Sequence, residues 1–209
     1  MKAISDSDAT AIAAAVGMAE KRTAGEIVPM IVRQSTYVRH VPVIVGLLSF
    51  IVFVLLLPGL YWILPGPIWL WDLAALVVSV LLSVSLSRVP FVQRLLTSRK
   101  DSTAAVMHRA ELEFLETGIP ATEGRTGVLI FVSSFERRAV ILGDKAISDR
   151  MKPEAWTEIL EAMITELRAG RMKEAFEGAI SRVGDVLARE FPIQPGDTNE
   201  LPNTLIVKD

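Results

Sequence analysis

The chain contains no cysteine, and this absence removes several kinds of chemistry. Disulfide bridges, thiol catalysis and cysteine-ligated zinc or iron–sulfur sites all need that residue. Only two histidines are present, His40 and His108, and they do not have the HxxxH or HExxH spacing of a zinc site. The sequence therefore predicts no cysteine- or histidine-based metal centre.

Motifs for phosphate binding and for nucleophilic catalysis are missing as well. The sequence has no GxxxxGK[ST] loop, no GxGxxG after a strand and no GxSxG turn. Ser133 and Ser134 end an apolar run, but no partner base is indicated and turn polarity explains them. Basic and acidic residues number 22 and 24, a formal net charge of -2, so no nucleic-acid partner is predicted.

Charge is also scarce in one long central stretch. Between Val41 and Leu86 the only charged residue is Asp72. A helix of roughly 20 apolar residues crosses a bilayer, so this stretch is long enough for two crossings. Pro58-Gly59 and the segment 65–67 break it, which predicts a transmembrane helical hairpin over residues 41–88. The alternative is a helical hairpin buried in a soluble core, which is unusual for a quarter of so short a chain.

The basic residues near this hairpin predict its orientation. They lie only on the two flanks, at Arg33, Arg39, Arg88, Arg94, Arg99 and Lys100. Because positive charge favours the cytoplasmic side, both flanks and both termini are predicted to be cytoplasmic. The aromatic residues near the connection, Tyr61, Trp62, Trp69 and Trp71, are then expected at the outer interface, and Arg39, Arg88 and Arg94 at the inner one. The polar segment after Met1 is not typical of a signal peptide, so we expect the hairpin itself to direct insertion.

The two flanks have the patterns of globular sequence. We expect helices over residues 5–22, 102–117, 153–168 and 172–191, and strands over residues 26–32, 126–133 and 139–142. Pro29 indicates an edge strand or a bulge for the first strand, and the tail 192–209 is expected to dock weakly or to fray. The order predicts an α/β fold with a small, mostly parallel sheet flanked by helices, into which the two-helix hairpin is inserted. The predicted parts are residues 1–40, 41–88, 89–191 and 192–209.

Charged residues around the last two strands are the best candidates for a site. Glu136, Arg137 and Arg138 lie between these strands. One arginine can form an internal ion pair with Glu136 or Glu26, while the other faces solvent, a partner or an anionic group. All three uses stay open from the sequence.

Acidic residues follow the last strand, at Asp144, Asp149 and Glu154. Carboxylates at a sheet end can bind Ca2+ or Mg2+ and activate water for phosphoester hydrolysis. Asp149 and Glu154 also suit the start of a helix at Pro153, where negative charge is favourable. The metal interpretation is therefore the weaker of the two.

Several of these segments resemble a known family. Gly25-Glu26-Ile27-Val28, the run Thr126–Val132, Phe135-Glu136-Arg137-Arg138 and the later Gly143 with its paired helices are similar to the TPM domain. The inserted hairpin and residues 199–203 resemble its bacterial predicted-membrane-protein branch. This resemblance implies a compact α/β domain in a bacterial inner membrane protein. Some members are described as phosphatases, others as photosystem-repair factors or auxiliary subunits of membrane proteins. The acidic residues proposed to bind calcium in some members have no matching cluster here.

The expected function is a membrane-anchored, non-catalytic interaction or assembly and quality-control module for membrane proteins. Its expected partners are the lipid bilayer and another membrane protein, and no cofactor is expected. The alternative is a metal-dependent phosphatase of the TPM type, using Ca2+ or Mg2+ at Asp144 and Asp149 with Arg137 or Arg138 on the phosphate.

Overall fold

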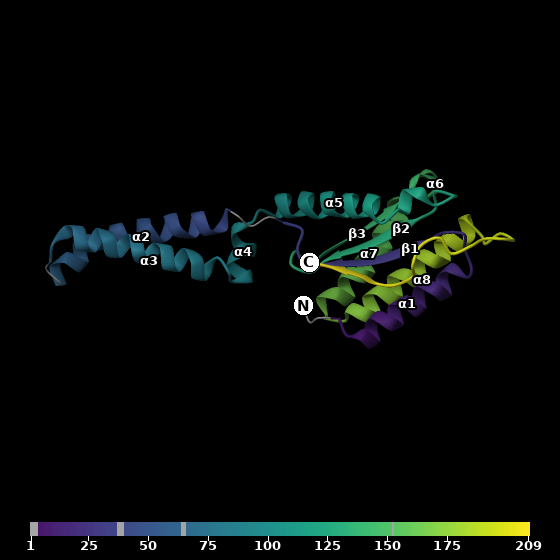
Figure 1. The fold of residues 1–209 in the computed structure, drawn as a ribbon, viewed down its shortest axis with the longest axis horizontal. Helices are drawn as coiled ribbons and strands as arrows, with labels where there is room; N and C mark the ends of the chain where they lie inside the picture. Colours follow the sequence, from purple (N-terminus) through teal and green to yellow (C-terminus); the bar gives the residue numbers. More distant parts are fainter. Residues whose placement is uncertain (1–3, 37–39, 64–65, 152) are drawn as a thin grey trace. The chain divides into compact units, whose positions relative to one another are not determined.

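The computed structural model describes residues 4–36, 40–63, 66–151 and 153–209 (Figure 1). The chain divides into two compact units. The larger contains Met1–Ser35 and Thr103–Asp209, and the smaller contains Thr36–Ser102. The larger unit is therefore built from chain on both sides of the smaller one.

A four-stranded sheet in the order β3-β2-β1-β4 forms the centre of the larger unit. Its strands are β1 (Ile27–Val32), β2 (Val128–Ser133), β3 (Arg138–Gly143) and β4 (Ile206–Lys208). β1 runs parallel to β2, with Ile27 opposite Val128, and parallel to β4, whereas β2 and β3 form an antiparallel hairpin. The α/β prediction is confirmed, although the sheet is mixed because one of its pairings is antiparallel.

β1 is a central strand, so the expectation of an edge strand or a bulge from Pro29 is wrong. Backbone N–H groups alternate between the two sides of a strand. The N–H of Arg33 donates to the carbonyl of Lys208 in β4, so Pro29, four residues earlier, has its nitrogen on the same side. Pairing with β4 begins only at Met30. The missing N–H of the proline therefore breaks no hydrogen bond of the sheet.

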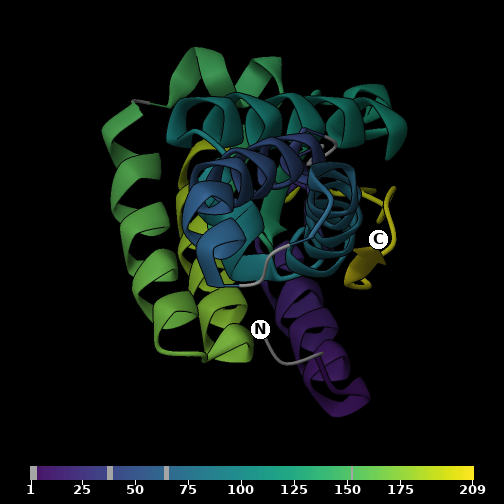
Figure 2. The same cartoon turned by 90° about the vertical axis from the view of Figure 1, so that its left-hand side faces the viewer.

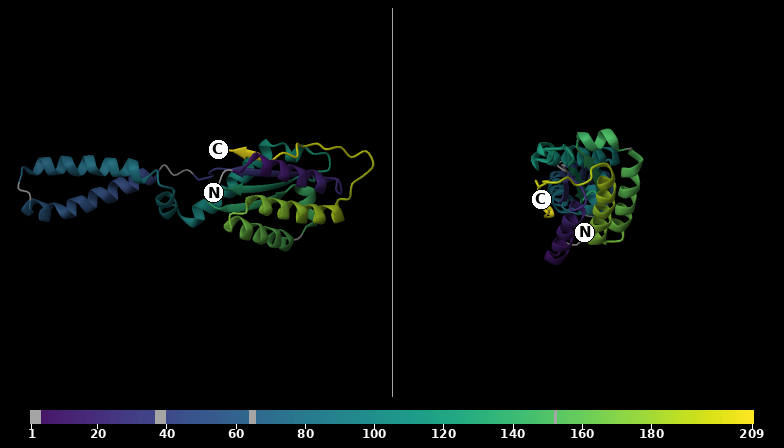
Figure 3. Two further views of the ribbon diagram at one scale, coloured as in Figure 1. Left: turned by 90° about the horizontal axis from the view of Figure 1, so that it is seen from below. Right: turned by 90° about the vertical axis from the view of Figure 1, so that its right-hand side faces the viewer.

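Helices cover both faces of the sheet. α1 (Asp6–Glu20), α7 (Pro153–Arg168) and α8 (Met172–Glu190) lie on one face, and α5 (Arg99–Glu116) lies on the other (Figures 1 and 3). α7 and α8 run side by side (Figure 2). Alternate side chains of β1 enter the two cores: Ile27 and Ile31 face the three-helix side, and Val28 and Met30 face α5. A short helix that the sequence patterns do not predict, α6 (Lys145–Arg150), and the 3-10 helix η1 (Ile119–Ala121) complete this unit.

The C-terminal tail is an ordered part of the sheet, which corrects the expectation that it docks weakly. Its last residues form β4 beside Met30–Val32. The carboxylate of Glu26 accepts hydrogen bonds from the N–H groups of Glu200 and Leu201, at 3.1 and 3.2 Å. The Lys208 ammonium lies 2.5 Å from the buried Glu113 carboxylate. These contacts supply the hydrogen bonds and the charge partner that a short apolar run could not supply alone.

The smaller unit contains α2 (Val41–Ile63), α3 (Ile68–Leu86) and the short α4 (Pro90–Leu96). α2 and α3 are long and apolar enough to cross a membrane. α2 continues through Pro58 to Ile63, so the break expected at Pro58 is wrong. A proline inside a helix removes one backbone hydrogen bond but does not always end the helix.

Small residues form much of the contact between α2 and α3. Ala75 and Ser79 of α3 are buried. A Cβ added at Gly46 would lie 3.4 Å from the Ser83 side chain, whose hydroxyl donates to the carbonyl of Pro42 at 2.6 Å. The large side chains point outward; Leu55, for example, is 74% exposed. Val41 and Val45 are also buried, whereas the largest apolar side chains of this unit lie outside.

Candidate functional site

The turn between β2 and β3 is tied to the chain that leaves β1. The Glu136 carboxylate accepts a hydrogen bond from the backbone N–H of Ser35 at 3.1 Å and another from the Ser133 hydroxyl. The hydroxyls of Ser35 and Ser133 are 2.8 Å apart. Ser133 is 0% exposed, so its hydroxyl holds the turn in place and is closed to a substrate.

The two arginines of this turn differ in their surroundings. Arg137 has a positive φ of 53°, in the left-handed region that few non-glycine residues adopt, and its side chain is exposed. Arg138 begins β3 opposite Ser133 and is half-buried. The turn therefore presents Arg137, rather than Arg138, to solvent.

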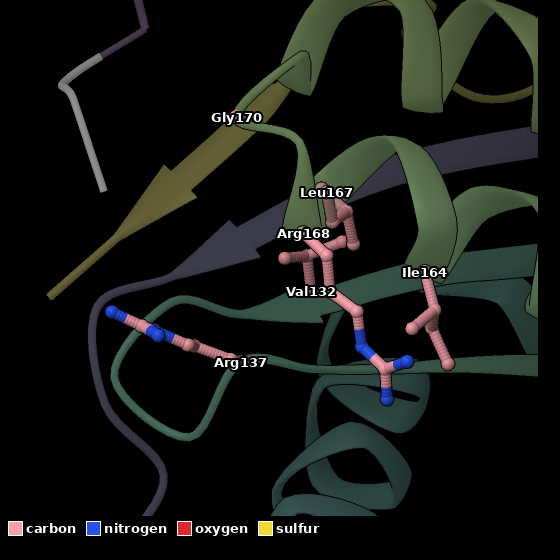
Figure 4. Close-up of a pocket in the computed structure, with 6 residues that line it drawn as sticks. All are labelled: Val132, Arg137, Ile164, Leu167, Arg168 and Gly170. Carbon is pink, nitrogen blue, oxygen red and sulfur yellow. The ribbon is translucent and has the colours of Figure 1, made fainter.

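A cavity of about 260 Å³ lies between this turn and the end of α7 (Figure 4). Its lining residues are Val132, Arg137, Ile164, Leu167, Arg168 and Gly170. Among the residues that the structure describes, no carboxylate forms an ion pair with Arg137 or Arg168. Sequence patterns place Arg168 in the last turn of its helix, but they give no sign that it lies near the β2–β3 turn. The cavity thus combines an apolar wall with two unpaired cations.

The three acidic candidates do not form a metal site. Asp144 caps α6, and its two carboxylate oxygens accept hydrogen bonds from Arg125 Nε and Nη2, at 2.8 and 2.9 Å. Burial acts to raise the pKa of Asp144, but the hydrogen bonds from Arg125 and from the Lys145 N–H outweigh it, so this pKa is lowered. Asp149 lies in α6 and Glu154 in the first turn of α7, both exposed.

This donor set does not fit a divalent cation. In the described part of the chain, no group of three or more histidine, aspartate or glutamate side chains is arranged to hold a metal ion. A cation at Asp144 would also have to displace the guanidinium of Arg125. The observed role of Asp144 is to cap a helix and to bind Arg125, whereas the sequence patterns assign capping to Asp149 and Glu154.

A second pair of carboxylates, which the search for motifs did not single out as a site, lies near the start of β1. Glu20 accepts a hydrogen bond from the N–H of Ile27 at 2.9 Å and another from the Asn203 side chain. Burial and the nearby Glu26 raise the pKa of Glu20 to about 7. Burial also raises the pKa of Glu26, whose oxygens hold the tail. No local pattern reveals this pair, because the tail that covers it comes from the far end of the sequence.

The predicted membrane-interface residues lie in the smaller unit. Trp69 is exposed and Trp71 half-buried in the first turns of α3. Arg88 follows α3 and is exposed, and Arg94 lies half-buried in α4. Arg39 lies outside the described residues, and only the backbone of Tyr61 and Trp62, within α2, is described.

Comparison with known families gives one match, which covers the middle of the larger unit and the end of the smaller one. Residues 88–186 match the family described as the TPM domain. This part of the chain is therefore similar to the TPM domain. The match includes β2, β3 and the helices from α4 to most of α8. β1, which pairs with β2 in the same sheet, comes from the chain before the smaller unit.

A solved structure has a fold similar to that of this protein. It is the NMR structure of BA42 from the psychrophilic bacterium Bizionia argentinensis, at a TM-score of 0.61 and 23% sequence identity. The alignment covers 100% of this chain and 97% of BA42. At this identity the similarity shows a shared fold alone. Among curated proteins, none matches the chain.

Proposed function

We propose that α2 and α3 cross a bacterial inner membrane and hold the TPM domain at its cytoplasmic surface. There the domain acts as a non-catalytic interaction module in the assembly or quality control of another membrane protein. The observation that carries this proposal is the packing of α2 against α3. Small residues lie between the two helices, while the largest apolar side chains face outward.

This packing is the reverse of what water favours. A helical hairpin in water buries its large apolar side chains, because each fully buried leucine or phenylalanine contributes roughly 1.5–3 kcal/mol. In lipid, that gain is absent, and close approach of helices through glycine, alanine and serine favours association instead. Gly46, Ala75, Ser79 and Ser83 are residues of this kind.

The cytoplasmic orientation rests on charge and on α4. Arg88 and Arg94 flank the end of α3, and the connection between α2 and α3 contains no lysine or arginine. In α4, Phe91 and Leu95 are each 71% exposed and lie four residues apart on one helix face. Apolar side chains beside a basic residue suit a helix that lies in the membrane interface.

The contacts of the polar groups support the proposed non-catalytic role. Asp144 forms an ion pair with Arg125, and the hydroxyl of the buried Ser133 donates a hydrogen bond to Glu136. Neither is placed to attack or to activate a substrate. A tether on the membrane raises the effective concentration of the domain toward other membrane proteins without any new contact.

Site-specific photo-crosslinking in cells tests this proposal. A photoreactive residue at the exposed Arg137 is expected to give an adduct with a membrane protein, whereas one at Glu111, exposed on α5, serves as the matched control. Recovery of no protein adduct at position 137, or equal adducts at both positions, contradicts the proposal.

A hydrolysis assay distinguishes the proposed interaction role from the alternative, a metal-dependent phosphatase. The full chain, given a generic phosphoester with Mg2+, Mn2+ or Ca2+, is expected to stay at background. Metal-dependent turnover that Asp144→Asn or Asp149→Asn abolishes would replace the interaction role with that of a phosphatase.

A further inference from the structure

We propose that the cavity between the β2–β3 turn and the end of α7 binds the phosphate monoester head of an amphiphile. Arg137 and Arg168 hold the phosphate, and the first carbons of the apolar stem lie against Val132, Ile164 and Leu167. The binding itself does not depend on whether α2 and α3 cross a membrane; only the source of the ligand does.

The charge at the cavity selects the head group. Arg137 and Arg168 supply two positive charges, and no carboxylate among the described residues is paired with either. The neighbouring Arg171 is already neutralised, because its guanidinium lies 2.5 Å from the Glu166 carboxylate. A phosphate monoester carries about -1.5 to -2 at pH 7 and matches two guanidinium groups, whereas a carboxylate matches one.

The walls of the cavity select the rest of the ligand. Val132 is fully buried, and Ile164 and Leu167 are half-buried members of the core on the three-helix side of the sheet. Water against such a wall gains few hydrogen bonds, so an alkyl group displaces it favourably. At about 260 Å³ the cavity is just below the usual range of roughly 300–1,000 Å³ for pockets that take drug-sized ligands. It therefore fits a head group and a short stem rather than a whole lipid.

The backbone at both rims leaves room for this ligand. Gly170 has a φ of 78° and an open space where a Cβ would be, so the chain turns away after α7 without covering the cavity. In Figure 4 the Arg168 side chain runs along the cavity, while the Arg137 side chain extends away from it. Arg137 is exposed, and exposed side chains change rotamer in picoseconds to nanoseconds. Binding thus requires a swing of Arg137 toward Arg168.

The test uses the full chain in nanodiscs of neutral lipid and n-butyl phosphate as the probe. We expect saturable shifts of the Val132, Ile164 and Leu167 methyl signals in NMR spectra. Arg137→Gln and Arg168→Gln are each expected to weaken binding about tenfold, the loss of one charge-assisted hydrogen-bonding partner. The matched control is Arg182→Gln, which removes an exposed arginine of α8 that does not line this cavity and is expected to leave affinity unchanged.

Two further probes separate the parts of the proposal. Inorganic phosphate is expected to bind more weakly than butyl phosphate because it leaves the apolar wall of the cavity in contact with water. Butanol, which has no phosphate group, is expected not to bind. The proposal is overturned if phosphate and butyl phosphate bind with equal affinity or if no methyl signal shifts. It is also overturned if the Arg137→Gln, Arg168→Gln and Arg182→Gln variants all bind butyl phosphate with equal affinity.

The source of the ligand is tested by adding phosphatidic acid to the nanodiscs. Methyl shifts like those given by butyl phosphate assign the site to a membrane lipid, which also supports the proposal that the domain is held at a membrane surface. Shifts with butyl phosphate alone assign the site to a soluble phosphate ester. The membrane tether is then tested separately, by the photo-crosslinking experiment in cells.

Discussion

Glu20 and Glu26 show how the fold changes the chemistry of single residues. Both carboxyl groups lie near the start of β1, and the tail covers them through Asn203, Glu200 and Leu201. Removing a carboxylate from water disfavours its charged form, and a second carboxylate nearby disfavours it further. The pKa of Glu20 is accordingly raised to about 7, so at neutral pH a large fraction of this side chain is protonated.

The raised pKa predicts how stability changes with pH. Between about 4.5, the ordinary value, and about 7, the folded state holds a proton on Glu20 that the unfolded state has lost. The unfolded state binds fewer protons, so the free energy of unfolding falls as pH rises through this window and levels off above it. Because Glu20 is only partly buried, we expect a change of about 1–3 kcal/mol from this residue.

Thermal unfolding in nanodiscs across this pH range measures the effect. Glu20→Gln keeps an oxygen to accept the Ile27 N–H, and it is expected to flatten the decline in melting temperature. Glu161→Gln, at an exposed position of α7, should follow the parent protein. A decline of equal size in parent and Glu20→Gln would show that another group is responsible.

Among the elements, β4 closes an edge that would otherwise be open. Without it, the edge of β1 from Met30 to Val32 would present unpaired backbone groups, which favour pairing with other chains. β4 is only three residues long, and it is held mainly by its surroundings. Leu205 and Ile206 pack against opposite sides of the sheet, and Lys208 pairs with Glu113.

Removal of residues 204–209 is therefore expected to destabilise the larger unit. Loss of the two half-buried apolar side chains costs about 2 kcal/mol, or roughly 4–8 °C in melting temperature for a domain of this size. The Arg33 amide, which donates to Lys208, should exchange faster with solvent. Removal of Asp209 alone, which lies beyond β4, is the control, and an unchanged Arg33 amide in the longer truncation would contradict the role of β4.

The elements also show what sequence reasoning can and cannot reach. The β2–β3 hairpin and the helices α1, α7 and α8 follow from local periodicity, and the structure has them close to the expected bounds. β4 has no such signal, because its partner strand and the pairing of Lys208 with Glu113 are distant in the sequence. The prediction from Pro29 is wrong for the same reason, because whether its nitrogen needs a hydrogen-bond partner depends on where the distant β4 begins.

The candidate site divides in the same way. Arg137 lies in a turn between two predicted strands, so the sequence alone predicts that its side chain is exposed. Arg168 reaches the same cavity only because α7 packs across β3. Arg125, the partner of Asp144, lies before β2, and its ion pair forms only when β2 and β3 are in register.

At the scale of the whole molecule, the two-unit division predicts a topology that can be measured. If α2 and α3 cross the membrane with both flanks inside, a reporter fused after Asp209 is active only in the cytoplasm. A reporter inserted in the connection between α2 and α3 is active only in the periplasm. Periplasmic activity of the C-terminal fusion would overturn the proposed orientation, because positively charged flanks favour the cytoplasm.

The position of β1 has a consequence for biosynthesis. Its sheet partner β2 begins about 95 residues later, after both apolar helices. At roughly 5–20 residues per second, a ribosome needs about 5–20 s to supply that partner. During this interval the nascent strand Ile27–Val32, apolar throughout, has no native neighbour. If α2 and α3 cross a membrane, their insertion therefore comes before the sheet can form, and a failed insertion leaves an incomplete domain with exposed apolar residues.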